Sequence, residues 1–208
     1  MQTDCINAIT SNQSNEVFLL HGVTGSGKTE VYIECIKKVL QNNKTAIVLV
    51  PEISLTPQVI SRFYSVFDKN IAVLHSSLSD GERYDEFRRI MRGDVSVVIG
   101  TRSAIFAPLN NIGIIIIDEE HSESYIQENN PKYDAIKIAK ERGKYHNCPV
   151  VLASATPSIK SIARSMKKVY HYLSMPKRVN NALLPEVTVV DMAEENKSRH
   201  PILSRELE

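Results

Sequence analysis

The sequence predicts an α/β fold, a parallel sheet with helices on both faces. Short apolar runs typical of buried strands alternate with polar or helical stretches along most of the chain, which is the pattern of a parallel sheet. A glycine-rich loop at residues 22–29 lies between one such run and a helical pattern, the order that a phosphate-binding loop requires. The 208 residues suffice for one sizeable domain.

The individual elements can be assigned in chain order. Helical spacing of apolar residues at 30–40 predicts a helix directly after the loop. Thr56 and Thr156 each precede a proline, and Ser79 forms a capping-box pattern with Glu82, so further helices are predicted to start there. The predicted strands are 17–21, 46–50, 71–75, 95–100, 112–117 and 150–153, with weaker strand patterns at 169–173 and 187–191.

Residues 22–29 read G-V-T-G-S-G-K-T, a complete phosphate-binding loop. Glycines let backbone N–H groups close on phosphate oxygens without obstruction by side chains. Lys28 can then reach the β- and γ-phosphates as a point charge, and the Thr29 hydroxyl can coordinate the Mg²⁺ that accompanies a nucleotide. The residues predicted to contact the nucleotide are Gly22, Val23, Thr24, Gly25, Ser26, Gly27, Lys28 and Thr29.

A cluster of acidic residues, Asp118-Glu-Glu-His121, follows the most apolar predicted strand. A carboxylate at the carboxyl end of a strand, facing the phosphate loop, can hold Mg²⁺ through water, and we assign this role to Asp118. Glu119 can polarise the water that attacks the γ-phosphate, so the pair predicts hydrolysis as well as binding. Acidic residues in this position also often cap a helix, and it is the upstream loop that favours the catalytic interpretation.

The composition excludes several classes of protein. Hydrophobic residues make up 42% of the chain and charged residues 24%, ordinary values for a globular protein, and no apolar run is long enough to span a bilayer. The first residues lack the features of a secretory signal, which predicts a cytoplasmic location. Cys5, Cys35 and Cys148 are widely separated, so we expect buried reduced thiols and no metal cluster. The net charge of +1 favours neither an acidic nor a basic partner.

The acidic cluster resembles the D-E-x-H box of superfamily 2 helicases, and other motifs of their first motor lobe occur in order. Residues 49–58 resemble motif Ia, residues 99–103 motif Ib, and residues 154–156 motif III. The amino-acid sequence of residues 22–32, together with Val50-Pro-Glu-Ile, is similar to that of the primosomal protein N′ (PriA) family of replication-restart helicases. The resemblance extends from about residue 2 to residue 192 and so covers nearly the whole chain.

This resemblance implies an ATP-dependent 3′-to-5′ DNA helicase with a RecA-like P-loop NTPase fold. ATP and Mg²⁺ would be its cofactors, DNA its partner, and primosome proteins the partners of the full-length protein. Residues 1–175 would form the ATP-binding lobe and residues 176–208 a linker toward a second lobe. That second lobe, its arginine finger and a zinc module have no counterpart in this sequence, so we expect a fragment with poor ATPase activity and no zinc of its own.

The motif positions also imply contacts with DNA. Thr101 and Arg102 are predicted to hold phosphates, although an arginine at a strand end is also often simply solvated. Thr56 and Gln58 are predicted to meet a phosphate at the start of their helix, and Thr56 can cap that helix at the same time. Tyr125 and Tyr133 flank a loop that resembles the DNA-coupling loop of such motors. They either stack on bases or anchor the loop to the domain.

Further residues are assigned through the resemblance to the nucleotide site. Gln2 can read the adenine, as an upstream glutamine does in related helicases, although a residue so near a terminus is as readily disordered. His121 is expected to relay the state of the nucleotide between the γ-phosphate and motif III, which consists of Ser154, Ala155 and Thr156. The predicted catalytic set is therefore Lys28, Asp118, Glu119 and His121.

Other functions fit the sequence less well. A regulatory GTPase would need a guanine-reading N-K-x-D segment, but residues 43–46 read N-K-T-A. A small-molecule kinase would need a lid and an acceptor site, neither of which is recognisable, and motifs Ia, Ib and III argue against it. An RNA helicase or another superfamily 2 translocase is the main alternative, because RNA and DNA are distinguished by contacts that this segment barely shows.

Overall fold

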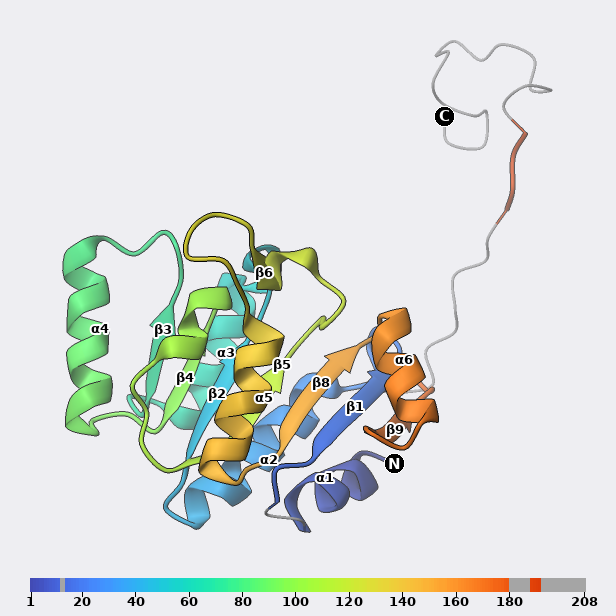
Figure 1. Ribbon diagram of the computed structural model, residues 1–208, viewed down its shortest axis with the longest axis horizontal. Helices are drawn as coiled ribbons and strands as arrows, with labels where there is room; N and C mark the ends of the chain where they lie inside the picture. Colours follow the sequence, from blue (N-terminus) through green and yellow to red (C-terminus); the bar gives the residue numbers. More distant parts are fainter. Residues whose placement is uncertain (12–13, 180–187, 192–208) are drawn as a thin grey trace.

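The structure is a computed structural model that describes residues 1–11, 14–179 and 188–191. Its centre is a seven-stranded sheet with the order β3-β4-β2-β5-β8-β1-β9, in which every pair of neighbouring strands is parallel (Figure 1). Most sequential strands that are not neighbours are connected by helices that cross over the sheet, whereas β4 and β5 are connected by a 3₁₀ turn and a loop. The predicted fold class is confirmed.

The bounds of most predicted elements agree with the observed ones to within a few residues, and the helices at 2–11 and 135–146 were not predicted. The sheet consists of β1 (Val17–Gly22), β2 (Thr45–Leu49), β3 (Ile71–Leu74), β4 (Val97–Gly100), β5 (Ile112–Ile117), β8 (Val150–Ser154) and β9 (His171–Met175). The helices are α1 (Gln2–Ser11), α2 (Lys28–Gln41), α3 (Pro57–Phe67), α4 (Asp80–Arg92), α5 (Ala135–His146) and α6 (Ile159–Met166). Short 3₁₀ turns occur at Glu52–Ser54, Arg102–Phe106 and Glu123–Tyr125, and β6 (Ile126–Gln127) pairs antiparallel with β7 (Tyr133–Asp134).

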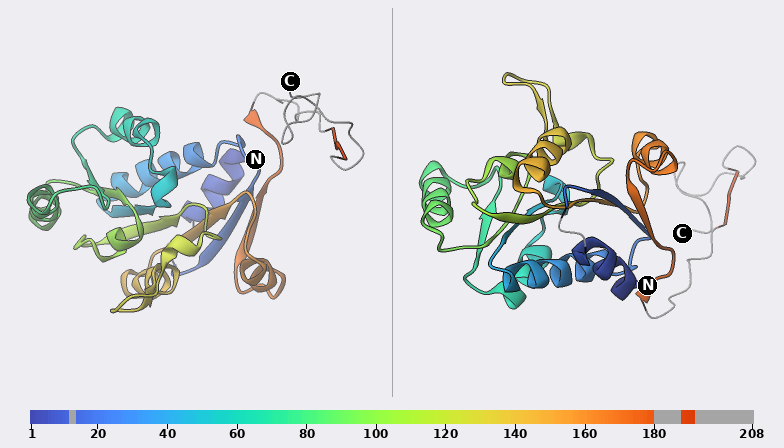
Figure 2. Two further views of the ribbon diagram at one scale, coloured as in Figure 1. Left: turned by 90° about the horizontal axis from the view of Figure 1, so that it is seen from above. Right: turned by 60° about the horizontal axis from the view of Figure 1, so that its bottom comes forward.

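Alternation along the strands divides the core into two layers. On one face, residues such as Phe18, Val48 and Ile116 pack against α1, α2 and α3. On the other face, residues such as Leu19 and Ile117 pack against α4, α5 and α6. Figure 2 shows α1–α3 and α5–α6 on opposite sides of the sheet. Every residue of the central strand β5 is buried, which explains its continuous apolar sequence.

Two of the three predicted helix starts are confirmed. Thr56 caps α3 by accepting a hydrogen bond from the backbone N–H of Val59, and a proline follows it at the first helical position. Ser79 and Glu82 form a complete capping box at the start of α4.

The prediction of an N-cap at Thr156 is wrong. α6 begins at Ile159, and its N-cap is Ser158, whose hydroxyl accepts a hydrogen bond from the N–H of Ser161. Thr156 donates its own N–H to the hydroxyl of Ser154 over 2.9 Å. The sequence offers a hydroxyl at both positions, and the tertiary contacts around Ser158 select the later one.

The C-terminal part of the described chain differs from the expectation. The weak pattern at 169–173 corresponds to β9, an edge strand that pairs with β1. This strand begins at His171, two residues later than predicted. Of the pattern at 187–191, residues 188–191 form no strand and residue 187 lies outside the described residues, as does most of the predicted linker. The three cysteines are free and buried. Within the part of the chain that is described, no helix has the length and apolar character to cross a membrane.

Candidate active site

The ends of three neighbouring strands bring the predicted catalytic residues to one edge of the sheet. β8 lies between β1 and β5 and is paired with both. The register sets His21 opposite Ser154, and Ile117 opposite Leu152. The phosphate loop after β1, the acidic cluster after β5 and motif III after β8 therefore meet at the carboxyl edge, where ligands bind in open α/β sheets (Figure 1).

The phosphate loop has a backbone that suits an anion. Gly25 and Gly27 have φ values of 78° and 86°, in the left-handed region that favours glycine. Gly27 is the N-cap of α2, so the free N–H groups of the first helical turn face the loop. The hydroxyl of Ser26 is buried and has no hydrogen-bond partner in the described structure. Lys28 folds back and donates from Nζ to the carbonyl of Gly22 over 2.8 Å.

Gln2 lies beside this loop. It belongs to helix α1, and its side-chain amide donates to the carbonyl of Ser26 over 3.1 Å. A Cβ at Gly27 would collide with the same amide. The sequence left open whether Gln2 reaches the nucleotide site or is disordered near the terminus. In the structure its side chain contacts the phosphate loop. Its reading of adenine stays a prediction.

Asp118 is held in a buried position by its neighbours. Its Oδ1 atom accepts hydrogen bonds from the hydroxyl of Tyr32, over 2.7 Å, and from the N–H of Glu119, over 3.0 Å. Burial raises the pKa of Asp118, while the hydrogen bond from Tyr32 and the charge of Lys28 oppose that rise. A divalent cation would favour the ionised carboxylate that Mg²⁺ requires. Asp118 and Lys28 interact electrostatically, as expected for two sides of one site.

Sequence reasoning missed the role of Tyr32. The residue is 2% exposed and lies in the first turns of α2, where an aromatic side chain is usually a simple core residue. Its hydroxyl connects α2, and hence the phosphate loop, to the end of β5. Burial beside Asp118 raises the pKa of Tyr32, so the hydroxyl remains a proton donor. The only signal in the sequence is its position four residues after the loop lysine.

Glu119 and His121 connect the acidic cluster to motif III. Glu119 has a φ of 46°, a left-handed conformation that is uncommon for a residue with a side chain. His121 forms a hydrogen bond of 2.8 Å between Nδ1 and the hydroxyl of Ser154. The Glu119 Oε2 atom lies 3.5 Å from that hydroxyl and 3.6 Å from Nδ1 of His121. The predicted contact of His121 with motif III is therefore present in the structure.

Tyr125 is not available to stack on a base. Its side chain is 1% exposed, and its hydroxyl donates to the carbonyls of Asp118, over 2.5 Å, and Leu49, over 3.2 Å. Of the two alternatives for this residue, the geometry supports an anchor, because the ring ties the loop to the ends of β5 and β2. The stacking role predicted for Tyr125 is corrected accordingly.

Several of the other predicted DNA contacts share one polar groove of about 200 Å³. Thr101, Arg102 and Tyr133 line it. The Arg102 guanidinium donates to the carbonyls of Ser124 and Ile126, over 3.2 and 2.8 Å, and lies 5.7 Å from the centre of the Tyr133 ring. Thr56 and Gln58 lie at the start of α3, outside the groove lining.

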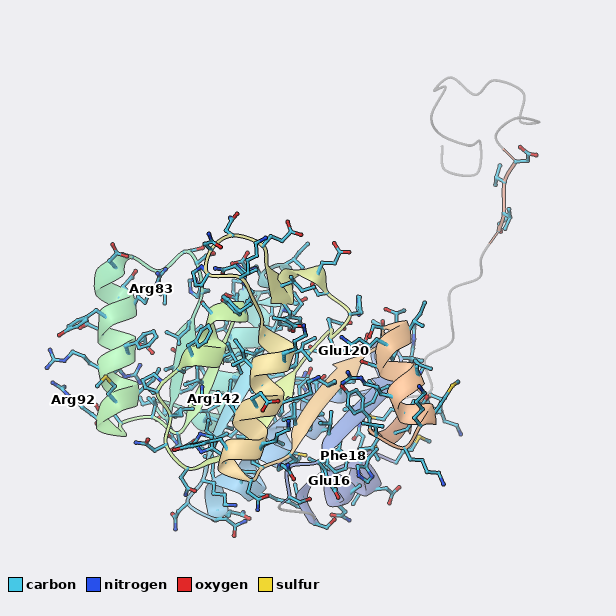
Figure 3. All side chains as sticks on the ribbon, viewed as in Figure 1. Glu16, Phe18, Arg83, Arg92, Glu120 and Arg142 are labelled. Carbon is cyan, nitrogen blue, oxygen red and sulfur yellow. The ribbon has the colours of Figure 1, made fainter. Side chains whose placement is uncertain are left out.

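The groove also contains residues that the sequence motifs did not indicate. Ser76 follows β3, and Arg83 lies near the start of α4; both line the groove together with Arg102. Arg83 is labelled near the upper end of α4 in Figure 3, and Arg92 at its lower end. Arg83 follows a capping box and belongs to no recognised motif, so only the folded structure reveals its position.

The comparisons with known proteins agree with this geometry. Residues 1–165 match the family model described as DEAD/DEAH box helicase. The chain belongs to this helicase family. Over 190 residues it is 57% identical to the replication restart protein PriA of Bacillus subtilis, a match that covers 91% of this chain and 24% of that protein. The corresponding protein of Synechocystis is 45% identical, with 100% of this chain and 26% of the relative covered.

The chain thus spans about a quarter of the length of these curated relatives, and the predicted resemblance to the PriA family is confirmed. Among solved structures, RecG bound to a three-way DNA junction superimposes with a TM-score of 0.61 at 22% identity, covering 86% of this chain and 24% of that one. This likeness concerns the fold alone, which is the RecA-like α/β fold.

We predict that Gly27→Ala weakens nucleotide binding by roughly tenfold or more. A left-handed φ costs an L-residue about 1–2 kcal/mol, every 1.4 kcal/mol or so is a factor of ten, and the new Cβ would also meet the Gln2 amide. Gly81→Ala is the matched control, because a Cβ there has no neighbour within 4 Å. Equilibrium titration with a fluorescent ATP analogue measures both. Equal affinities for the two variants would contradict the role given to the loop.

Proposed function

We propose that this chain is the ATP-binding lobe of a DNA helicase and that it carries the Mg-ATP half-site and part of a DNA track. The observation that carries the proposal is the junction of the phosphate loop, the acidic cluster and motif III at one sheet edge, joined through Tyr32 and Ser154. A site that only stored a nucleotide would not need a hydrogen-bonded path from the acidic cluster to motif III. In an enzyme that couples hydrolysis to movement, such a path is one physical means of carrying the coupling.

The residues of this site divide the chemistry between them. The N–H groups of residues 25–29 and the Lys28 ammonium would bind phosphate oxygens, and Thr29 and Asp118 would hold Mg²⁺. When bound, the metal neutralises the charge that develops on the phosphate oxygens. Glu119 accepts a hydrogen bond from the attacking water and orients it. His121 lies between the γ-phosphate region and motif III. Because it is hydrogen-bonded to Ser154, a displacement of His121 caused by the γ-phosphate also displaces Ser154.

The polar groove is proposed as the DNA track. Arg102 and Arg83 supply positive charge, and Thr101, Ser76 and Ser124 supply hydroxyl or backbone groups, the usual partners of a phosphate backbone. The carbonyls of Ser124 and Ile126 hold the Arg102 guanidinium in place before any ligand arrives. Tyr133 is half-buried against Phe106, with a distance of 5.0 Å between ring centres, and presents part of its ring to the groove.

Further properties are proposed for the longer protein through its relatives. These are named replication restart proteins, which supports a role in replication restart together with primosome proteins. The 3′-to-5′ polarity, the zinc module outside this chain and the cytoplasmic location remain predictions of the family resemblance.

In the full-length protein, Glu119→Gln is expected to leave ATP affinity nearly unchanged and to lower kcat by roughly 10² to 10⁴, the contribution of a positioned general base. Lys28→Ala should weaken binding as well, because it removes a phosphate contact. Equilibrium nucleotide binding and steady-state phosphate release separate the two effects. Turnover of Glu119→Gln equal to that of the unsubstituted protein would overturn the assigned role.

Arg102→Ala is expected to weaken binding of single-stranded DNA and to reduce the salt dependence of log K by about 0.7, the slope for one lost phosphate contact on a single strand. Arg92→Ala is the matched control, since it also removes one positive charge. Arg92 lies at the end of α4 opposite to Arg83 and does not line the groove (Figure 3). Fluorescence anisotropy over a series of salt concentrations provides the measurement. The same slope for both variants would show that the groove is not the track.

Residues 1–208 alone should hydrolyse ATP poorly even with DNA present. An arginine finger from a second lobe contributes roughly 10³ to 10⁵ in turnover in related phosphate-loop enzymes. The assay compares DNA-stimulated turnover of this segment with that of a longer protein that includes the following lobe. Comparable rates would mean that the segment is a self-sufficient NTPase.

A further inference from the structure

Glu120 is the buried member of the acidic cluster. Its side chain is 4% exposed, whereas Glu119 beside it is only half-buried. The Glu120 Oε1 atom accepts a hydrogen bond of 2.7 Å from the N–H of Ser158. Its Oε2 atom accepts bonds from the hydroxyls of Ser158, over 3.2 Å, and Ser161, over 2.9 Å. Figure 3 shows Glu120 between the sheet edge and α6.

All of these donors belong to the N-cap or the first turn of α6. A buried carboxylate is costly unless it is hydrogen-bonded, and the first turn of a helix offers free N–H groups and a favourable dipole. Ser158 also caps α6 through the N–H of Ser161, so Glu120 and the cap form one network. Glu120 therefore fixes where the chain leaves motif III and enters α6.

The backbone of the cluster sends its side chains in different directions. The left-handed Glu119 separates Asp118, which is bonded to Tyr32 of α2, from Glu120, which is bonded to α6. The N–H of Glu120 donates to the carbonyl of Ala153 over 3.0 Å, which ties the cluster to β8. Segment 154–161 is consequently held at both ends, by His121 on Ser154 and by Glu120 on Ser158 and Ser161.

We propose that Glu120 is a positioning residue that couples the nucleotide site to motif III and α6. With both ends of segment 154–161 tied to the acidic cluster, a displacement of Glu119 and His121 moves the segment as one unit. With the Glu120 contacts removed, segment 154–161 remains attached to the side chains of the acidic cluster only through Ser154. A displacement of Glu119 and His121 then no longer moves Ser158 and Ser161 with Ser154. The role rests on the proposed function, since it concerns how ATP turnover responds to DNA.

The test uses Glu120→Gln and Ser161→Ala in the full-length protein, with Glu123→Gln as the matched control. Glutamine keeps the size of the side chain but replaces one acceptor oxygen with a donor that faces other donors. Glu123 is an exposed carboxylate three residues further along the same loop. The measurements are nucleotide affinity, kcat per bound nucleotide with and without single-stranded DNA, and hydrogen exchange at residues 158–162 with and without an ATP analogue.

The expected result is a fall of about tenfold in the ratio of DNA-stimulated to unstimulated kcat for Glu120→Gln, a size typical of residues that modulate coupling between sites. Nucleotide affinity should stay within about twofold, because the carboxylate of Glu120 bonds Ser158 and Ser161 and no residue of the phosphate loop. Ser161→Ala should change the ratio in the same direction by less, and the double variant should be no worse than Glu120→Gln. ATP-dependent protection of residues 158–162 should disappear in Glu120→Gln.

The opposite result is that Glu120→Gln and Glu123→Gln show the same ratio of DNA-stimulated to unstimulated kcat and the same protection of residues 158–162. That result would overturn the positioning role and leave the proposed function in place. A purely structural role would lower only the fraction of protein that binds nucleotide, with kcat per bound nucleotide unchanged, and would likewise refute the proposal. If Glu120→Gln does not fold, Ser161→Ala decides through the same ratio. Absence of DNA stimulation in the unsubstituted protein would overturn the proposed function and the coupling role with it.

Discussion

The parallel pairing of β8 with both β1 and β5 is the constraint on which the rest of the site depends. It sets the loop after β1, the cluster after β5 and motif III after β8 side by side, because parallel neighbours end at the same edge. The pairing is secured by side chains buried on both faces of the sheet, each contributing about 1.5–3 kcal/mol. Such a frame can hold Glu119 in its left-handed conformation, which costs on the order of 1 kcal/mol.

Polar side chains then connect the loops that this frame brings together. Tyr32 joins the helix of the phosphate loop to Asp118, Tyr125 joins the ends of β5 and β2, and His121 joins the acidic cluster to Ser154. Each of these bonds is made at the edge of the core, where partial burial strengthens it and leaves an unpaired group costly. The site is therefore pre-organised by contacts with the body of the domain, and these hydrogen bonds connect each of its loops to another part of the site or of the sheet.

Much of the fold and part of the site could be predicted from the sequence because the signals are local. The apolar run of β5, the glycines at 25 and 27, and the caps at Thr56 and Ser79 each follow from chain neighbours alone. The parts that were missed or left open depend on partners far apart in the chain. Tyr32 bonds a residue 86 positions away, Tyr125 one 76 positions away and Ser161 one 41 positions away. No local pattern distinguishes such tyrosines and serines from ordinary core, loop or cap residues.

The central claim is that the junction at this sheet edge is an ATP site whose turnover is governed by DNA. It is tested most directly by the steady-state ATPase rate of the full-length protein in Mg²⁺, measured without nucleic acid, with single-stranded DNA and with single-stranded RNA of the same sequence. We expect DNA to raise the rate well above that without nucleic acid and above that with RNA. A rate that is the same under all three conditions, or one raised by RNA alone, would contradict the account.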